Sequence, residues 1–269
     1  MTKLIAEIGW NHLGNVSLAK KMILAAKKNG ASFAKFQIFN EKNLKPGPWD
    51  SDGRRNIYRK AQMTEKKQAI LYFFSKKNKI KYFASVNSID DANLLLKVSN
   101  SLVKIPSMES RNINLIKYCA KKFRKIFLST GTSNLSEIKR IVKLIPKNKL
   151  ILMHCVSSYP CNLENINLLK IKKLKKLTKN IGFSDHTLGI IACKVSLEFN
   201  PLYIEKHFTI NKKLPGRDNK FAILPSDLKE IHDYIIERKK TFVWRGNKIQ
   251  NCEREVRKLY SGRWSLNID

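Results

Sequence analysis

Residues 180–207 read NIGFSDHTLGIIACKVSLEFNPLYIEKH, and this stretch decides the fold. Two short runs at 180–184 and 202–206 are rich in apolar residues, among them Ile, Phe and Tyr. The longer segment between them, 189–199, has the apolar spacing of a helix. A strand, a helix and a second strand in this order are typical of a parallel sheet, because parallel strands need a long crossover connection. The stretch therefore predicts one repeat of a β/α fold.

The same alternation extends outward from this stretch through most of the 269-residue chain. Strands are predicted at 3–8, 32–38, 80–85, 101–105, 125–129, 149–154, 180–184 and 202–206. Helices are predicted at 17–29, 64–78, 89–98, 112–123, 133–145, 166–178, 189–199 and 225–240. Eight such units close a (β/α)8 barrel, a fold that usually needs about 250 residues. The sequence therefore predicts the α/β class and a (β/α)8 TIM barrel.

The chain reads as one catalytic domain followed by a short extension. No linker, repeat or low-complexity tract divides residues 1–240, so we assign them to a single barrel domain. Residues 241–269 read as a basic C-terminal extension that is too short to form another domain. One connection, 39–62, is unusually long, and loops of that size are either functional covers or disordered inserts. Both interpretations are open for this segment.

The formal net charge of +32, from 53 Lys and Arg against 21 Asp and Glu, attracts anionic partners of any kind. Most of the excess is lysine spread over nearly every predicted helix, which is typical of solvated outer faces. A nucleic-acid-binding module would add aromatic stacking platforms or a recognition motif among the basic residues, and we find neither. Nucleic acid is therefore not a predicted partner.

The N-terminus and the cysteines indicate the compartment. The start, MTKLIAEIGWNHLG, carries Glu7 inside its apolar stretch and lacks the basic region and long uncharged run of a secretory signal. No segment offers the run of about 18 apolar residues that a membrane span needs. The five cysteines are scattered without metal-type CxxC spacing, which fits reduced thiols. We therefore expect a cytoplasmic protein with no membrane partner.

Polar and ionisable residues recur at or just after the end of each predicted strand, where a barrel collects its catalytic groups. They are Glu7, Asn11, His12, Lys35, Gln37, Ser85, Lys104, Ser107, Glu109, Ser129, His154, Ser157, Tyr159, Ser184, Asp185, His186, Glu205 and His207. A single Ser or Lys at a strand end is more often a helix cap or a solvated tip. Eight consecutive occurrences favour a shared active site.

Two features of this set indicate which ligands the site would bind. Lysines followed by several hydroxyl residues suit a phosphate-bearing anion, because ammonium groups neutralise it while hydroxyls hydrogen-bond its oxygens. His186 and His207 end neighbouring predicted strands, so their rings could share a metal such as Mn, Fe, Zn or Co. They could also be hydrogen-bonded residues of a partial core, and His154 could play either part.

At these strand ends the sequence resembles the sialic acid synthase family, also called the N-acetylneuraminate synthase family. The segments that carry the resemblance are IAEIGWNHLGN (5–15), AKFQ (34–37), VKIPSMESRNINLI (103–116), LSTGT (128–132), LMHCVSSYP (152–160), IGFSDHTLG (181–189) and IEKHFTINKKLPGRD (204–218). Their order, their spacing and their positions at strand ends agree with the barrel predicted above.

This resemblance implies a transferase that condenses phosphoenolpyruvate with N-acetylmannosamine or a related 2-acetamido sugar, forming a nonulosonic acid and phosphate. It also implies a divalent metal, commonly Mn²⁺, and a homodimer. Family members normally continue into an antifreeze-like domain that supplies an arginine to the neighbouring subunit's sugar site, and this sequence stops near where its linker would begin. We therefore expect a barrel without that domain, with weakened acceptor binding, a separate antifreeze-like chain as partner, or a different sugar.

Carried over position by position, the resemblance implies roles for individual residues. His186 and His207 would bind the metal, and Glu7 would sit beside the metal and its water as the third catalytic residue. Phosphoenolpyruvate would contact Lys35, Ser85, Lys104, Ser107, Ser129, Ser157 and Ser184. The sugar would contact Gln37, Glu109, Tyr159 and Asp218. The segment FASVNS (83–88) departs from the family pattern, with Ser85 standing where the family has threonine.

Several alternatives remain open beside this reading. Another phosphoenolpyruvate-using synthase of keto-sugar acids would share the fold, and so would a barrel aldolase with a Schiff-base lysine. A sugar-binding barrel with weakened catalysis is the non-enzyme alternative. Sialic, legionaminic and pseudaminic acid synthases share most of the motifs, and His154 resembles the first two types.

Overall fold

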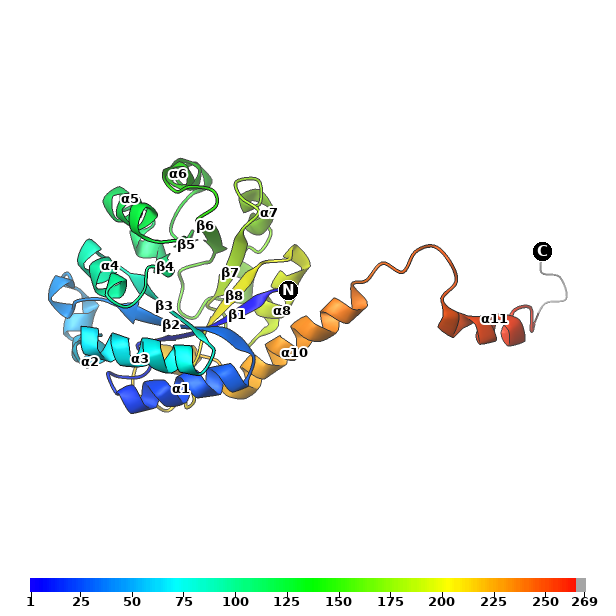
Figure 1. Cartoon of the computed structure of the whole chain (residues 1–269), viewed down its shortest axis with the longest axis horizontal. Coiled ribbons are helices and arrows are strands. Elements are labelled where there is room, and N and C mark those ends of the chain that lie inside the picture. Colours follow the sequence, from blue (N-terminus) through cyan, green and yellow to red (C-terminus); the bar gives the residue numbers. More distant parts are fainter. Residues whose placement is uncertain (265–269) are drawn as a thin grey trace. The chain divides into compact units, whose positions relative to one another are not determined.

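The computed structural model describes residues 1–264, and the chain divides into two units, 1–235 and 236–269. In the first unit, eight parallel strands pair in sequence order, and the last pairs with the first to close a barrel. Helices surround the barrel on its outside (Figure 1). This arrangement confirms the predicted (β/α)8 barrel.

The elements follow the predicted alternation closely. The strands are β1 (Lys3–Gly9), β2 (Ala31–Ile38), β3 (Lys81–Val86), β4 (Leu102–Ile105), β5 (Lys125–Ser129), β6 (Leu150–His154), β7 (Ile181–Asp185) and β8 (Tyr203–His207). The α-helices are α1 (Val16–Lys28), α2 (Arg54–Ala61), α3 (Glu65–Lys77), α4 (Ile89–Leu96), α5 (Ile113–Lys122), α6 (Leu135–Ile141), α7 (Lys170–Leu174), α8 (Ile191–Ser196), α9 (Arg217–Phe221), α10 (Pro225–Thr241) and α11 (Arg254–Tyr260). Each predicted strand coincides with one of the strands of the barrel.

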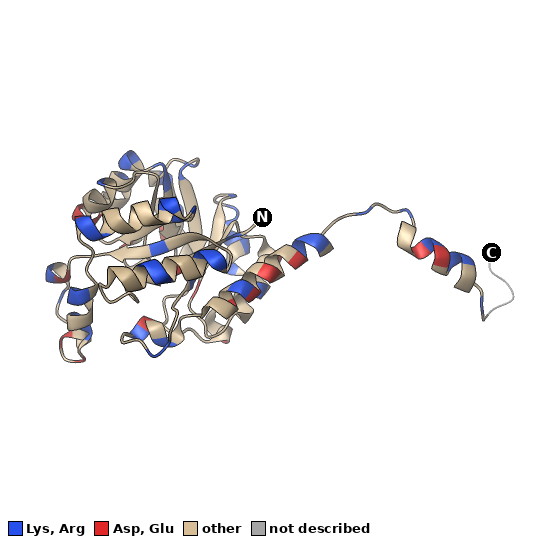
Figure 2. Ribbon diagram, turned by 60° about the horizontal axis from the view of Figure 1, so that its bottom comes forward, with Lys and Arg blue, Asp and Glu red and all other residues tan. Residues whose placement is uncertain are grey.

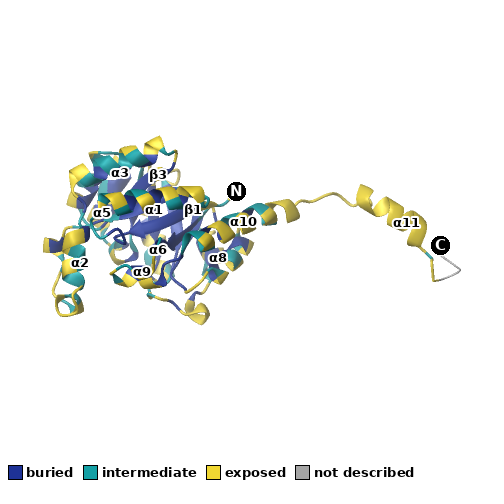
Figure 3. Cartoon of the chain, turned by 90° about the horizontal axis from the view of Figure 1, so that it is seen from below, coloured by how far each residue is buried: buried dark blue, intermediate teal, exposed yellow. Residues whose placement is uncertain are grey.

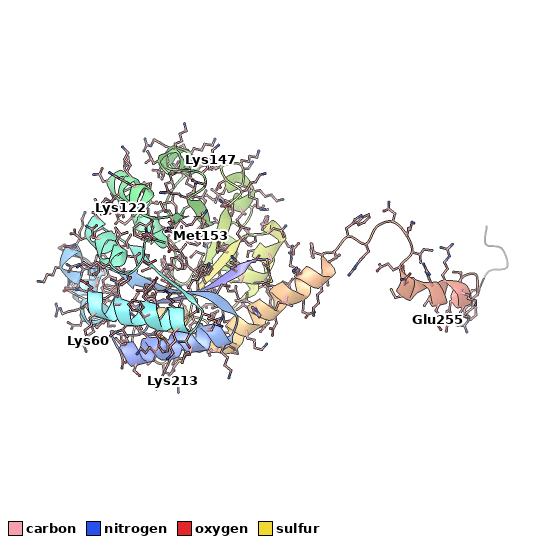
Figure 4. All side chains as sticks on the ribbon, in the orientation of Figure 1. Lys60, Lys122, Lys147, Met153, Lys213 and Glu255 are labelled. Atoms are coloured by element: carbon pink, nitrogen blue, oxygen red, sulfur yellow. The ribbon has the colours of Figure 1, made fainter. Side chains whose placement is uncertain are left out.

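The inside of the barrel is filled by bulky side chains. Phe33, Phe83 and Phe127 pack with ring centroids 5.0 to 6.5 Å apart. Met153, labelled in Figure 4, belongs to the same buried cluster. Gly182 on β7 makes room for this methionine, because a Cβ at residue 182 would lie 2.2 Å from the Met153 sulfur. A barrel packed in this way offers a ligand its mouth and not its centre.

A second apolar layer lies between the barrel and the helices. The strands and the inner helix faces are buried, whereas the outer helix faces are exposed (Figure 3). Several helices begin at residues whose side chains accept a hydrogen bond from the backbone of the first turn. These caps are Asn15, Thr64, Ser88, Asn112 and Asn134. They satisfy helix N–H groups and so fix where each connection from the barrel mouth ends.

The long segment 39–62 contains helix α2 and is therefore not a disordered insert. Arg55 donates to Glu41 at 2.9 Å, which ties the start of the segment to the helix. Tyr58 packs edge-on against Trp10, which follows β1, with ring centroids 5.0 Å apart. The segment thus lies against the barrel mouth.

The helix predicted at 166–178 is too long, because only Lys170–Leu174 form α7. A 3-10 turn, Leu163–Asn165, precedes it. Asn167 has a φ of 48°, a left-handed conformation that does not continue an α-helix. Local backbone geometry therefore overrides the helical apolar spacing of this segment.

Lysine and arginine are spread over the outer faces of the helices of the first unit (Figure 2). Lys60, Lys122, Lys147 and Lys213 lie at the periphery of this unit in Figure 4. This distribution agrees with the predicted solvated outer faces. All five cysteines are free. None of the helices within residues 1–264 has the length and apolar character needed to cross a membrane.

The second unit contains the end of α10 and helix α11. A 3-10 turn, Asn251–Glu253, precedes α11, and every residue of α11 is exposed. The predicted domain boundary at residue 240 stays a prediction. Residues 265–269 of the predicted extension lie outside the described residues.

Candidate active site

A cavity of about 310 Å³ lies at the carboxyl ends of the strands. All but two of the residues with a predicted catalytic or ligand-binding role line it, namely Glu7, Lys35, Gln37, Ser85, Lys104, Ser107, Ser129, Tyr159, Ser184, His186, His207 and Asp218. The two that do not are Ser157 and Glu109. The other lining residues, none of which was predicted to contact a ligand, are Trp10, Tyr58, Asn87, Pro106, Met108, Cys155, Glu205 and Arg217.

The strand register brings the polar residues to common levels of the barrel. His207, Glu7 and Lys35 are register partners across β8, β1 and β2. Ser85 and Lys104 are partners across β3 and β4. Inward-facing side chains at one level of a closed barrel point toward its axis. Residues far apart in the sequence therefore converge in one cavity.

A chain of buried charges runs through the cavity. Nζ of Lys35 lies 2.6 Å from Oε2 of Glu7 and 3.6 Å from Oε1 of Glu205. Nζ of Lys104 lies 2.5 Å from the same oxygen of Glu205. Gln37 donates from Nε2 to Oε1 of Glu7 at 2.8 Å. Two ammonium groups and two carboxyl groups thus compensate one another, which makes their burial tolerable.

Burial and these partners act in opposite directions on the pKa values. Burial raises the pKa of Glu7, and Lys35 offsets this only in part. Burial also acts to raise the pKa of Glu205, but Lys104 and Lys35 outweigh it and hold that pKa below its ordinary value. For Lys104, burial acts to lower the pKa, and the charge of Glu205 more than compensates, so this pKa is raised. Glu205 is therefore the ionised partner of the lysines, and Glu7 is the more basic carboxylate.

His186 and His207 lie side by side at the ends of β7 and β8, with ring centroids 5.6 Å apart. The Nδ1–H of His186 donates to the Val156 carbonyl oxygen at 2.7 Å, which leaves a lone pair on Nε2. Burial lowers the pKa of His186 to about 4 and that of His207 well below its ordinary value. Both rings are therefore neutral near neutral pH, and neutral imidazole is the form that binds a metal.

This donor set fits a divalent cation that takes two nitrogens from the protein. Nδ1 of His207 is buried and has no hydrogen-bond partner in the part of the chain that the structure describes, and Oδ2 of Asp218 lies 3.5 Å away. Among residues 1–264, no group of three or more His, Cys, Asp or Glu side chains could hold a metal ion. A cation bound by the two histidines would keep open positions for substrate or water oxygens, as catalytic metal sites do.

Asp218 and Tyr159, both predicted sugar contacts, lie beside the histidines. Burial, followed by the charge of Glu7, raises the pKa of Asp218 to about 7. Arg217 and Trp10 act to lower this pKa but do not cancel the effect of burial. The ring centroid of Tyr159 lies 4.3 Å from that of His186, and Arg217 donates from Nη2 to the Tyr159 carbonyl oxygen at 2.5 Å. Aromatic and acidic groups thus flank the imidazoles.

Ser107 and Ser157 meet beside Gly131. A Cβ at residue 131 would lie 2.3 Å from Oγ of Ser157 and 2.6 Å from Oγ of Ser107. Only glycine therefore lets the backbone after β5 approach these hydroxyls so closely. Oγ of Ser157 is buried and unpaired among the described residues, and it lies next to the cavity rather than in its lining.

Glu109 and His154 are engaged outside the cavity lining. The Glu109 carboxylate accepts a hydrogen bond from Nδ2 of Asn112 at 2.8 Å. The Nε2–H of His154 donates to the Ile166 carbonyl oxygen at 2.8 Å, and the ring stacks on Phe183. His154 is therefore a packed, hydrogen-bonded residue and not a neighbour of the histidine pair.

Glu205 and Arg217 are the most informative cavity residues without a predicted role: Glu205 belonged to the strand-end set, and Arg217 did not. Glu205 stands at a strand end, but the sequence does not show that its carboxylate pairs with the two lysines that were predicted to bind phosphoenolpyruvate. Arg217 directly precedes Asp218 in the GRD motif, so its position was a usable indication. Trp10 and Cys155 lie inside the segments that carry the family resemblance. Tryptophan and cysteine are also common in a buried core, so their residue types alone did not indicate that they line the cavity.

Comparisons with known proteins identify relatives with named activities. N,N'-diacetyllegionaminic acid synthase from Campylobacter jejuni is 34% identical, over 96% of this chain and 81% of that protein. Pseudaminic acid synthase from Helicobacter pylori is 30% identical, over 82% of this chain and 69% of that protein. The crystal structure of N-acetylneuraminic acid synthetase from Leptospira borgpetersenii has a TM-score of 0.85 at 31% identity, covering 97% of this chain and 92% of that one.

The family model covers most of the barrel. It is the model of the NeuB family, and it matches residues 22–246, which include β2 to β8 and the paired histidines. The relatives just described are acid synthases by name, so this chain is an enzyme. Sequence, fold and site agree, and the chain belongs to the NeuB family.

Proposed function

We propose that this enzyme condenses phosphoenolpyruvate with the open-chain aldehyde of a 2-acetamido sugar, forming a nonulosonic acid and releasing phosphate. The observation that supports the proposal is that two buried lysines and two neutral histidines share one cavity. Lys35 and Lys104 offer cationic groups to an anion, whereas His186 and His207 offer nitrogens to a metal. The reaction needs both, because one substrate is a phosphate ester and the other an aldehyde.

Phosphoenolpyruvate carries a phosphate and a carboxylate, and the lysine side of the cavity suits both. Lys35 and Lys104 would neutralise them, with Glu205 remaining as the anion that keeps the ammonium groups in place. The hydroxyls of Ser107 and Ser129 line the same cavity and would hydrogen-bond phosphate oxygens. A hydrogen bond to a charged group contributes about 1.5–3 kcal/mol.

His186 and His207 would hold the divalent cation, which we propose is Mn²⁺. When bound, the cation supplies polarisation of the sugar aldehyde, so that the enol carbon of phosphoenolpyruvate can attack it. Tyr159 and Asp218 lie against the two imidazoles and would orient the sugar. Gln37, which donates to Glu7, lines the same cavity.

Glu7 is the base that we propose for the water that adds to C2 of phosphoenolpyruvate. Its pKa is raised by burial, which makes it a better proton acceptor than an exposed carboxylate. Gln37 and Lys35 contact one oxygen each, so both oxygens have a defined orientation. Lys35 and Lys104 would stabilise the charge that develops on the departing phosphate.

A Schiff-base aldolase is the main alternative reaction. Such an enzyme needs a lysine whose pKa is lowered, so that the free amine is present. Glu205 instead raises the pKa of Lys104. The ion pair therefore favours anion binding by Lys104 over amine catalysis.

The acceptor sugar, the homodimer and the cytoplasmic location stay predictions. Relatives named for legionaminic and pseudaminic acid are 34% and 30% identical, so overall identity does not choose between their acceptors. A separate antifreeze-like chain as partner also stays a prediction.

The test is phosphate release from phosphoenolpyruvate with Mn²⁺ and a panel of 2-acetamido sugars that includes N-acetylmannosamine. We expect release only when the enzyme, the metal and one of the sugars are all present. Lys104→Met should raise the phosphoenolpyruvate concentration that the release requires, whereas Lys97→Met, which removes an exposed lysine, should not. Borohydride trapping of a substrate on a lysine without phosphate release would indicate the aldolase, and sugar binding without turnover would indicate the weakened barrel.

A further inference from the structure

A second buried ion pair lies directly behind the paired histidines. Nζ of Lys206 lies 2.6 Å from Oδ2 of Asp185, and these side chains are only 3% and 0% exposed. Neither residue lines the cavity. Asp185 precedes His186 in the sequence, and Lys206 precedes His207.

Strand register explains why the pair lies behind the site. Asp185 and Lys206 are register partners on β7 and β8, one step after the partners Ser184 and Glu205. Successive residues of a strand point to opposite faces. Ser184 and Glu205 line the cavity, so Asp185 and Lys206 point out of the barrel toward the helix layer, where Cys193 of α8 donates to Asp185 at 3.2 Å.

The ion pair also holds the turn that carries His186. The Asp185 carboxylate accepts hydrogen bonds from the backbone N–H and the hydroxyl of Thr187, at 2.9 and 3.2 Å. Lys206 donates to the Thr187 carbonyl oxygen at 2.5 Å. Residues on both sides of His186 are thus tied to the residue that precedes His207.

A buried ion pair is a poor source of net stability, because its desolvation cost is close to the energy that its attraction returns. Its directional bonds do, however, fix how two segments sit against each other, which is the best-attested use of such groups. Metal ligands need that kind of precision, because bond lengths must match within about 0.2 Å. An apolar pair at these positions would pack the layer without fixing the two strand ends.

We propose that the Asp185–Lys206 pair positions His186 and His207 for the divalent cation and thereby sets the affinity for it. Both residues are positioning residues, since neither touches the cavity. This inference rests on the proposed function, because it assumes that the histidines bind the metal.

The test compares the wild-type chain with the double variant Asp185→Asn/Lys206→Met. The two new side chains have nearly the same shapes and no charge, and the Asn oxygen can still accept from the Thr187 N–H. We expect Mn²⁺ affinity, measured by calorimetry or by the electron paramagnetic resonance of free Mn²⁺, to fall roughly 10- to 100-fold, as is typical of outer-layer changes. Affinity for phosphoenolpyruvate in chelator should stay the same, and saturating Mn²⁺ should restore phosphate release.

The control is Lys194→Met/Glu230→Gln, which removes a partly exposed ion pair of 2.6 Å between α8 and α10. Its Mn²⁺ affinity should match that of the wild type. If the double variant does not fold, Lys206→Met alone gives the same readout, because Asp185 keeps the backbone N–H and hydroxyl of Thr187 and the thiol of Cys193 as hydrogen-bond donors.

The outcomes separate this inference from the proposed function. A double variant that binds Mn²⁺ as tightly as the wild type overturns the inference and leaves the proposed function standing. Equal weakening of Mn²⁺ and phosphoenolpyruvate binding shows general loosening and also overturns it. A wild-type chain that binds no Mn²⁺ overturns the proposed metal site and the inference together.

Discussion

Lys104 on β4 and Glu205 on β8 form a buried ion pair across the barrel mouth, since these strands lie on opposite sides of the closed sheet. The same Glu205 oxygen lies 3.6 Å from Lys35, so one carboxylate holds two ammonium groups. Without ligand, Glu205 is therefore the main anion that compensates Lys104. An anionic substrate would take over part of that compensation.

Glu205→Gln should lower the stability of the ligand-free protein and increase the effect of an anion on it. Removing one partner of a buried pair typically costs about 3–5 kcal/mol. Inorganic phosphate or phosphoenolpyruvate would replace the lost charge, so we predict a larger ligand-induced rise in Tm than in the wild type. Thermal unfolding in chelator, with and without each anion, measures this. Glu65→Gln, in an exposed pair with Lys97, is the control, and equal ligand-induced shifts in Glu205→Gln and the wild type would contradict the prediction.

Lys104→Met and Asp218→Asn should separate the two substrates. The first removes a charged contact to phosphoenolpyruvate, a loss of about 1.5–3 kcal/mol or roughly 10- to 150-fold in affinity. The second replaces the Asp218 carboxylate, which lies beside His207, by an uncharged amide, and it should raise chiefly the KM for the sugar. Steady-state kinetics with each substrate varied in turn is the measurement. If both variants raise only the phosphoenolpyruvate requirement, the assigned division of the cavity is wrong.

His186→Ala and His207→Ala should each remove most of the metal affinity, because water does not replace an imidazole held in place by the barrel. This loss of Mn²⁺ affinity should exceed the roughly 10- to 100-fold that is typical when a residue that only orients a metal ligand is changed. Calorimetric titration with Mn²⁺ measures it, with His232→Ala on α10 as the matched control. Unchanged Mn²⁺ binding in both cavity variants would remove the basis for the metal site.

The fold was predictable because each strand carries its own apolar run and each helix its own spacing. The strand at 125–129, for example, coincides with β5 residue for residue. The helix predicted at 166–178 failed because the left-handed turn at Asn167 leaves no trace in apolar spacing. Asn is a common residue in such turns, yet it is equally common in ordinary loops.

The site was predictable only as far as strand ends converge. That rule collects Lys35, Lys104 and His207 in one cavity without any knowledge of partners. It does not tell which side chains at a strand end point inward, and so it included Asp185, which does not line the cavity, and Glu109, which bonds Asn112 instead. Ion pairs between distant strands depend on side-chain directions that a single sequence does not reveal.

His154 should make the protein less stable in mild acid. Burial, together with Lys170, lowers its pKa to about 4, although the hydrogen bond to Ile166 opposes this. The unfolded chain has the ordinary histidine value of about 6.5 and takes up a proton below it. The folded state takes up that proton only below about 4. Stability is therefore lost as pH falls from about 6.5 to about 4, by roughly 3 kcal/mol for this residue.

His154→Gln removes the titrating group and keeps a donor for the Ile166 carbonyl oxygen. Near pH 7 we expect the variant to be less stable, because the ring no longer stacks on Phe183. Between about pH 7 and pH 5, the wild type should lose about 2 kcal/mol more than the variant, so the two stability curves converge. Urea unfolding at a series of pH values measures the free energy of unfolding, and His232→Gln, with a side chain 32% exposed, is the control. The curves converge only if His154 takes up a proton in the unfolded chain and stays neutral in the folded protein. Parallel curves for wild type and His154→Gln would therefore contradict a lowered pKa for His154.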